Sequence, residues 1–169
     1  MDTVEGFAEY VGARRGRLLR SAVLLGCSLN EAEDIVQTTL MQCYASWSRV
    51  ARAADPDAYV YRVLVNCLAK SRRRRWWQER PTEDLPEGGH HDEAELAAVA
   101  QTLRAALQRL SAEQRAVLVL RFLADLSERQ VAEVLRIAPG TVKSRTSRGL
   151  ALLAADARLT DLPGHRSQP

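Results

Sequence analysis

The chain has 169 residues, of which 46% are hydrophobic and only six are prolines, so it can bury a core and is not a disordered chain. No apolar run approaches the roughly 18 to 20 residues that cross a bilayer, so we expect no membrane insertion. Three well-separated cysteines fit neither a disulfide framework nor a zinc cluster. The N-terminus lacks the basic and apolar pattern of a signal peptide, and we therefore expect a cytoplasmic protein.

The net charge of +3 is distributed unevenly along the chain. Residues 1–80 carry 13 basic and 9 acidic side chains, and residues 94–169 carry 11 and 7. Between them, residues 81–93 hold five acidic residues, two prolines and two glycines, with no lysine or arginine. This composition resists regular structure and is typical of a linker. We expect an all-α protein of two small helical domains, 1–80 and 94–160, joined by a flexible acidic linker and followed by a disordered tail, 161–169.

The first two predicted helices lie between residue 3 and about residue 47. Apolar residues recur at helical spacing up to Gly26, which can end a helix. A second helix begins near Ser28 or Asn30, either of which could cap it, and its apolar stripe is Val36, Leu40, Cys43, Tyr44 and Trp47. Its other face combines an acid, an amide, a hydroxyl and a methionine: Asp34, Gln37, Thr38 and Met41. Such a face is either solvated or docks onto helices of another protein. The spacing alone leaves both interpretations open.

The third predicted helix follows the sequence "ADPDAY", where Asp55 can cap it and Pro56 fits its first turn. It continues to about Arg75. One stripe along it joins an aromatic residue, an amide and three cations: Tyr59, Arg62, Asn66, Lys70 and Arg73. Cations bind phosphate, an amide can bond a base edge, and a ring can stack on an unpaired base. The stretch "SRRRRWW" ends the helix with more positive charge than a helix dipole needs, which favours a nucleic-acid surface.

The second block is also predicted to be helical. Two capping boxes, Ser111 with Gln114 and Ser127 with Gln130, predict where two of its helices begin. The helix after the first box carries Val117, Leu118, Leu120 and Phe122. The second box opens a short helix, "ERQVAEVL", which leads through "RIAPG" into the longer helix "TVKSRTSRGLALLAADA". A short capped helix, a tight turn and a longer basic helix describe a helix-turn-helix.

The last predicted helix has two different faces. We expect an apolar side to face inward, made of Val142, Thr146, Leu150 and Leu153. The other side places short hydroxyls between cations, which lets a helix enter the major groove closely: Lys143, Ser144, Ser147 and Arg148. The alternative is an ordinary helical hairpin with a solvated face. The coincidence of cap, turn and basic face favours DNA binding.

Three segments, in this order, resemble an alternative σ factor of bacterial RNA polymerase. They are "EAEDIVQTTLMQCYASW", "DPDAYVYRVLVNCLAKSRRRR" and "LSERQVAEVLRIAPGTVKSRTSRGLALL". The match is to the extracytoplasmic-function (ECF) group of the σ70 family, which keeps only the second and fourth σ domains. The size and the short linker most resemble an actinobacterial SigE-like subgroup. One departure is Arg136, which stands in the turn where that family usually has glycine.

The resemblance implies partners and roles. The core polymerase would meet this chain through its β′ clamp helices and β flap, the former at Asp34, Gln37, Leu40 and Met41. Promoter DNA would be bound at its −10 element by the loop "SRVARAADPD" and by Tyr59, Arg62, Asn66, Lys70, Arg73 and Arg74. Its backbone near the captured base would be held by Lys70 and by Arg72 to Arg75. The −35 element would be read by Lys143, Ser144, Ser147 and Arg148. An anti-σ factor is a further partner that relatives use. We expect no cofactor and no metal.

Two rival interpretations remain at this point. A free-standing helix-turn-helix regulator would explain the second block but leave the face around Asp34 and the basic stripe of the third helix without a role. An enzyme acting on nucleic acid would need a metal-binding acid cluster, a nucleophile beside a histidine or a phosphate-cradling glycine loop. The sequence has none of these patterns, so we expect no enzyme activity.

Overall fold

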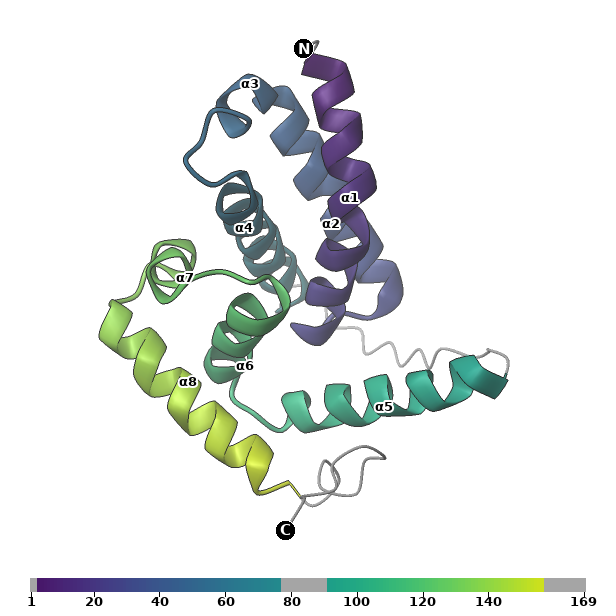
Figure 1. Cartoon of the computed structure of the whole chain (residues 1–169), viewed down its shortest axis with the longest axis vertical. Helices are drawn as coiled ribbons and strands as arrows, with labels where there is room; N and C mark the ends of the chain where they lie inside the picture. The colour runs from purple at the N-terminus through teal and green to yellow at the C-terminus, as the bar shows by residue number, and fades with distance from the viewer. Residues whose placement is uncertain (1–2, 77–90, 157–169) are drawn as a thin grey trace.

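The computed structural model describes residues 3–76 and 91–156, and helices make up most of both stretches (Figure 1). Within these residues there is no strand, so the predicted all-α class is confirmed. One element, η1, is a π-helix. In chain order the elements are α1 (Thr3–Leu24), α2 (Leu29–Ala45), α3 (Trp47–Val50), α4 (Pro56–Trp76), α5 (His91–Gln108), α6 (Ala112–Leu118), η1 (Val119–Leu123), α7 (Glu128–Leu135) and α8 (Pro139–Ala154).

Helices α1, α2 and α4 pack together to form the first domain (Figure 1). Gly26, just after α1, has a φ of 108°, a conformation that side chains rarely adopt, which explains why this helix ends there. Ser28 caps α2, and Glu31 completes a capping box that the sequence prediction had not included. The short helix α3 was also not predicted. It lies in the loop that was expected to help hold the −10 element.

Polar contacts fix α1 against α4. The carboxylate of Asp57 accepts hydrogen bonds from the hydroxyl of Tyr10 at 2.8 Å and from Nε of Arg14 at 3.0 Å. Burial, followed by the bond to Asp57, raises the pKa of Tyr10 well above its usual range. Deeper in the domain, the buried hydroxyls of Ser21 and Tyr61 lie 3.0 Å apart. The helix that carries the predicted DNA-facing stripe is therefore held in one register on α1.

The second domain contains α6, η1, α7 and α8. Both predicted capping boxes are confirmed, Ser111 with Gln114 at the start of α6 and Ser127 with Gln130 at the start of α7. Helix α7 ends at Arg136, whose φ of 55° and ψ of 47° place it in the left-handed region. Arg136 stands where the family usually has glycine, and it therefore holds a side chain in a backbone conformation that is unfavourable for residues other than glycine.

The π-helical segment η1 changes the predicted apolar side of this region. It follows α6 directly and shifts the register of the side chains, because a π-helix bonds residues five apart rather than four. Leu120 is fully buried, whereas Phe122 is 61% exposed. Phe122, an apolar residue of this predicted helix, therefore lies outside the core. Leu150 in α8, which was expected to face inward, is 44% exposed, so that expectation is wrong.

The two domains pack against each other, and a single apolar core runs through both. Helix α7 lies beside α4 (Figure 1). The segment η1 contacts α1. The predicted linker, 81–93, lies mostly outside the described residues, and α5 begins at His91 within it. The prolines and glycines that marked the linker all precede His91. The boundaries of the two domains otherwise stay a prediction, as does the tail 161–169, which lies outside the described residues.

Candidate nucleic-acid interface

Helix α8 presents its basic face to solvent. Val142 is fully buried and anchors the helix, while Lys143, Ser147 and Arg148 are exposed. Ser144 is half-buried, and its hydroxyl donates a 3.1 Å hydrogen bond to the carbonyl of Thr141. Three of the four residues predicted to read the −35 element therefore face outward together. Ser144 keeps only its oxygen lone pairs for a further partner.

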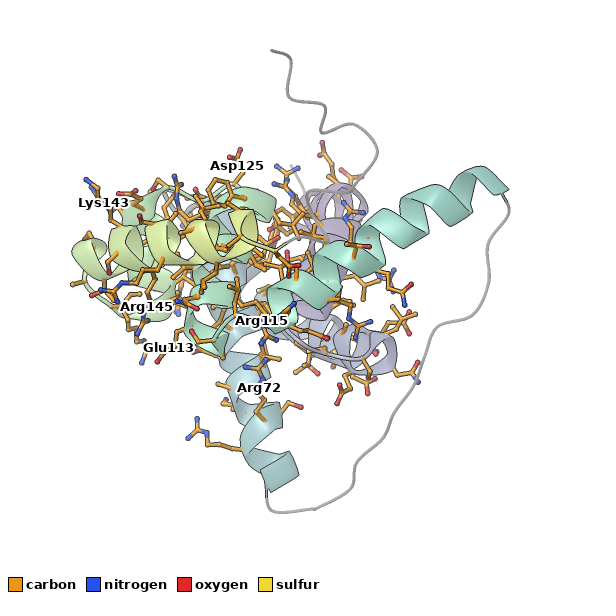
Figure 2. The ribbon with its side chains drawn as sticks, turned by 90° about the horizontal axis from the view of Figure 1, so that it is seen from below. Arg72, Glu113, Arg115, Asp125, Lys143 and Arg145 are labelled. Atoms are coloured by element: carbon orange, nitrogen blue, oxygen red, sulfur yellow. The ribbon has the colours of Figure 1, made fainter. Side chains whose placement is uncertain are left out.

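Arg145 has a structural contact that the sequence did not indicate. Its Nη2 lies 3.4 Å from Oε2 of Glu113 in α6. This ion pair holds α8, the second helix of the helix-turn-helix, against α6. Figure 2 shows Arg145 on the side of α8 that faces Glu113, with Lys143 elsewhere on the helix. The cations of α8 thus divide into an inward one that positions the helix and outward ones that are available to an anion.

The predicted stripe on α4 lies on the surface of the first domain. Asn66, Lys70 and Arg73 are exposed, and Tyr59 is half-buried. The guanidinium of Arg62 lies over the ring of Tyr59, 5.0 Å from its centre, so these two side chains form one flat cationic surface. The side chain of Arg74, also predicted to bind here, lies outside the described residues.

Arg72, beside this stripe, turns back onto its own domain. Its Nη2 donates to the carbonyl of Leu25 at the end of α1. Arg115 of the second domain lies close to the same turn, and burial, together with the charge of Arg72, lowers the pKa of Arg115. Figure 2 shows Arg72 and Arg115 near each other. Arg72, which the resemblance placed at the DNA backbone, is thus engaged in a contact within the protein.

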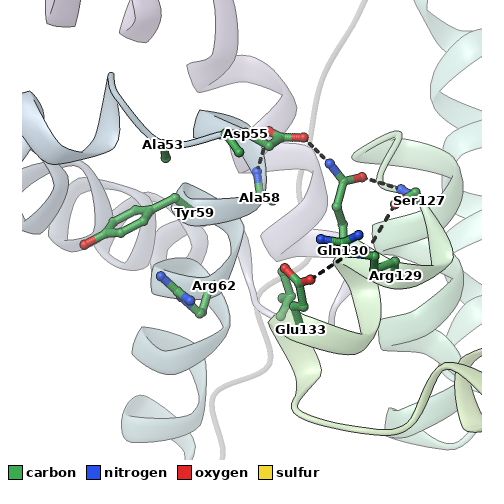
Figure 3. Close-up of a pocket in the computed structure, with 11 residues that line it drawn as sticks. Ala53, Asp55, Ala58, Tyr59, Arg62, Ser127, Arg129, Gln130 and Glu133 are labelled. Atoms are coloured by element: carbon green, nitrogen blue, oxygen red, sulfur yellow. Dashed lines mark hydrogen bonds and ion pairs between the residues drawn. The ribbon is translucent and has the colours of Figure 1, made fainter.

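A groove of about 440 Å³ adjoins Tyr59 and Arg62, and both domains line it. Figure 3 shows the side from the first domain, with Asp55 at the start of α4, and the side from α7, with Gln130 and Glu133. Asp55 caps α4 as predicted, since its Oδ1 accepts a 3.0 Å hydrogen bond from the N–H of Ala58. Its other oxygen, Oδ2, accepts from Nε2 of Gln130. Sequence reasoning missed this contact because it joins residues in different domains.

A second groove, of about 520 Å³, runs along α1 and α2. Asp34 and Gln37 line it and are exposed, and Met41 is 65% exposed beside them. Leu40 also lines the groove but is buried, so it contributes an apolar wall rather than an exposed contact. Phe7 completes the apolar part of the lining. The predicted face is therefore a shallow apolar groove with polar groups at its edge.

Phe7 also extends the aromatic packing behind this groove. Its ring lies 4.9 Å from that of Tyr44 and 5.2 Å from that of Trp47, measured between centres. Tyr44, predicted as a core residue, is half exposed and forms part of the groove instead. An aromatic cluster that is open on one side offers a rigid apolar surface for a partner helix.

Metal-binding and membrane-spanning features are both absent from the described stretches. There, no group of three or more histidine, cysteine, aspartate or glutamate residues is arranged to hold a metal ion. The same stretches contain no helix long and apolar enough to cross a membrane. All three cysteines are buried.

Known families match most of the chain. The family model described as "Sigma-70 region 2" matches residues 10–78, and "Sigma-70, region 4" matches residues 100–153. The chain is 38% identical to an RNA polymerase sigma-E factor of Streptomyces avermitilis over 156 residues, which are 92% of this chain and 87% of that one. It is 32% identical to the ECF RNA polymerase sigma factor SigM of Mycobacterium tuberculosis over 140 residues, 82% and 70% of the two chains.

Solved structures share the architecture. The σ factor RpoE of Bartonella quintana, in a co-crystal with the anti-σ factor NepR, superposes with a TM-score of 0.71 at 25% identity and covers 93% of this chain and 98% of its own. CnrH, solved with the cytosolic domain of CnrY, has a TM-score of 0.64 at 22% identity, over 89% and 86%, and supports the fold alone.

The two matched regions, in this order and on two helical domains, define a σ-type transcription initiation factor. The chain belongs to the ECF group of the σ70 family, and it is an alternative σ factor of the SigE-like kind that directs transcription initiation. The resemblance stated from three sequence segments is thereby confirmed.

Proposed function

We propose that this σ factor uses three separate surfaces. The outward face of α8 reads the −35 element as duplex. The stripe on α4, with the loop before it, holds an unpaired −10 base and its backbone. The groove on α1 and α2 binds core RNA polymerase at the β′ clamp helices. Because polymerase and promoter DNA share the bacterial cytoplasm, we place this protein there.

The observation that carries the proposal is the surface on α4. Arg62 stacked on Tyr59 is a flat cationic surface suited to an unpaired base, and exposed Asn66 and Lys70 follow it along the helix. A free-standing duplex-binding regulator has no use for such a surface, since paired bases are stacked on each other. Capturing an exposed base offsets part of the cost of opening the duplex.

Two further partners follow from the exposed apolar surfaces and from the relatives. Phe122, exposed on η1, supports an apolar contact between the second domain and the β flap. The RpoE protein of Bartonella quintana was solved with an anti-σ factor. We propose that an anti-σ factor also regulates this chain. Core polymerase supplies the chemistry, so we propose that this protein itself catalyses no reaction.

Run-off transcription tests the proposal. Purified bacterial core polymerase is incubated with and without the protein on a pool of promoters from its own genome. Transcripts that start only when the protein is present are expected, and aligning their start sites gives both promoter elements. If none appear while the protein alone binds duplex DNA, the free-standing regulator replaces the proposal.

Substitutions of two arginines in α8 test the −35 surface, one as the variant and the other as its control. Arg148→Ala removes an exposed cation from the outward face, whereas Arg145→Ala removes the cation that pairs with Glu113. If Arg148 bonds a base edge, its replacement weakens promoter binding by about 1 to 3 kcal/mol, and if it bonds a phosphate, the salt slope falls by about one. Arg145→Ala is expected to leave the salt slope unchanged, because its guanidinium already pairs with Glu113, and to weaken promoter binding less than Arg148→Ala does. Equal effects of both variants would contradict the assignment of the outward face.

The polymerase-binding groove has its own pair of variants. Asp34→Lys reverses a charge that lines the groove, and Gln42→Lys adds a positive charge on an exposed part of the same helix that does not line it. We expect about a tenfold loss of affinity for core polymerase with the first variant, because a like charge opposed to a partner surface is costly. Retained affinity of Asp34→Lys, measured by fluorescence anisotropy, would remove this groove from the interface.

A further inference from the structure

Three arginines from different helices converge on the turn between α1 and α2. Nη2 of Arg72 in α4 donates to the carbonyl of Leu25. Nη2 of Arg104 in α5 donates a 3.3 Å hydrogen bond to the carbonyl of Cys27. Arg115 of α6 lies beside the glycine between these two residues, and Figure 2 shows it near Arg72. We call Arg72, Arg104 and Arg115 the arginine cluster.

Gly26 allows two members of the arginine cluster to come close together. A Cβ at this position would lie 2.9 Å from Nη1 of Arg115 and 3.4 Å from Nη2 of Arg72, so a larger residue would push them apart. The two nitrogens are therefore at most about 6 Å from each other, a separation that one oxyanion spans with two N–H···O bonds of about 2.8 Å.

No carboxylate pairs with the arginine cluster in the part of the chain that the structure describes. The ion pairs there all involve other arginines. Glu31, the acid nearest to this turn in the sequence, accepts the N–H of Ser28 at 2.8 Å in the capping box of α2. The three arginines bond neutral carbonyl groups instead, and for Arg115 these are the carbonyls of Gln108 at 3.4 Å and Leu110 at 3.2 Å.

The helix dipoles offset only part of the positive charge. The bonded carbonyls lie at or just beyond the C-terminal ends of α1 and α5, and each such end carries about −0.5 of an elementary charge. Even with Glu31 included, three guanidinium groups keep an excess of roughly one to two positive charges. Burial, followed by the charge of Arg72, lowers the pKa of Arg115, which is the expected effect of like charges in contact.

The arginine cluster also contains donors without an acceptor. Three buried side-chain nitrogens in the described stretches bond no acceptor, and two of them are Nε of Arg104 and Nε of Arg115. Buried donors are nearly always bonded, and a bound ion is one reason for an exception. Capping two helix ends requires neither a third guanidinium nor these two donors. The arginine cluster is therefore better suited to an anion than to helix capping alone.

We propose that Arg72, Arg104 and Arg115 bind a phosphate monoester, such as the terminal phosphate of a nucleotide. This group is tetrahedral, carries close to two negative charges at neutral pH and has three oxygens that accept strong hydrogen bonds. Three guanidinium groups from three helices can each bond one of these oxygens, whereas a carboxylate is planar and has two. The site is separate from the three surfaces of the proposed function, and its test involves no polymerase.

Isothermal titration calorimetry of the full-length protein tests the site with inorganic phosphate, at about pH 8, where phosphate is mainly a dianion. Arg72→Gln is the variant, because Arg72 is exposed. Its control, Arg129→Gln, removes the same charge in α7, where Arg129 pairs with Glu133. We expect Arg72→Gln to weaken phosphate binding by about tenfold or more, since a bond to a charged group is lost, and the control to leave it nearly unchanged.

Equal losses in both variants would mean general attraction to a basic protein, an adventitious ion only, and would overturn the proposal. Absence of binding to the unsubstituted protein would overturn it as well. Arg72→Lys keeps the charge without the planar fork, and we expect an intermediate affinity from it. Sulfate, which is also tetrahedral and doubly charged, should compete with phosphate, and acetate should not. Phosphate should also raise Tm of the unsubstituted protein more than that of Arg72→Gln.

Three further probes distinguish the source of the phosphate: adenosine monophosphate, a short single-stranded oligonucleotide with a 5′-phosphate, and the same oligonucleotide without it. Tighter binding of adenosine monophosphate than of inorganic phosphate, lost in Arg72→Gln, supports a free nucleotide. A gain in affinity from the 5′-phosphate, lost in the same variant, supports the end of a strand. If the unphosphorylated oligonucleotide also displaces inorganic phosphate, the arginine cluster holds a phosphodiester of DNA, and the proposal is overturned.

Discussion

The turn of the helix-turn-helix contains a strained residue, and relieving the strain should stabilise the protein. Arg136 follows α7 with φ 55° and ψ 47°, while its backbone N–H still bonds the carbonyl of Ala132. For a residue with a side chain, this region costs about 1 to 2 kcal/mol. Arg136→Gly removes that cost but adds about 0.4 to 1 kcal/mol of unfolded-chain entropy. The expected net gain is about 0.5 to 1 kcal/mol.

For a domain of this size, about 1 kcal/mol moves the melting temperature by roughly 2 to 4 °C. Arg136→Gly should therefore raise Tm by about 1 to 4 °C in a thermal melt followed by circular dichroism. Arg136→Ala separates the backbone from the guanidinium, because alanine keeps the strained Cβ and loses only the charge. We expect little change in Tm from it. A rise for alanine equal to that for glycine would refute the backbone explanation and assign the effect to charge.

Other expectations concern packing, the buried thiols and salt. Gly149→Ala should lower Tm, because a Cβ there would lie 2.9 Å from Cδ1 of buried Leu118. A Cβ at Gly12 meets no atom within 4 Å, so Gly12→Ala should raise the free energy of unfolding by about 1 kcal/mol through helix propensity, and Tm with it. Burial, with a smaller effect from Cys67, raises the pKa of Cys43 from 9.0 to about 11. Its thiolate fraction at pH 8 should then be about a hundredfold below that of the urea-unfolded chain, which a thiol-reagent assay measures. The folded protein favours the protonated thiol, so stability should fall as pH rises from about 9 to about 11. Promoter binding by the holoenzyme should weaken steeply between 50 and 200 mM salt, and a flat dependence would contradict phosphate contacts.

Local signals predicted the helices well because each of them acts over three or four residues. The serine caps at positions 111 and 127, the Asp55 cap and the stop at Gly26 are present where the sequence placed them, and of the two candidate caps of α2 the structure uses Ser28. A capping hydrogen bond links residues three apart, so its partners are visible in the sequence itself. The outward cations of α8 were predictable for the same reason, since one buried residue, Val142, fixes the rotation of the whole helix.

The apolar faces predicted for the helices differ from the structure in two situations. In one the helix departs from 3.6 residues per turn, and in the other a neighbouring element of the fold covers only part of the apolar side. The π-helical segment η1 places Phe122 outside the core. A period of 3.6 residues per turn assumes an α-helix, so it cannot predict which residues of a π-helix face inward. Tyr44 and Leu150 fit the apolar stripe of their helices and are nevertheless half exposed. Each lies at the border of its stripe, where the extent of the neighbouring element decides burial.

No local sequence pattern could predict the contact between the two domains, because it joins side chains that lie far apart in the chain. Asp55 and Gln130 each look complete in the sequence as a helix cap, yet a carboxylate has a second oxygen and an amide has two N–H donors. A cap uses only one side of each group. The unused sides, 75 residues apart in the chain, meet in the folded protein. A residue that ends a local motif can therefore carry a long-range contact at no cost to the motif, and in this σ factor that contact lies beside the groove that Tyr59 and Arg62 line.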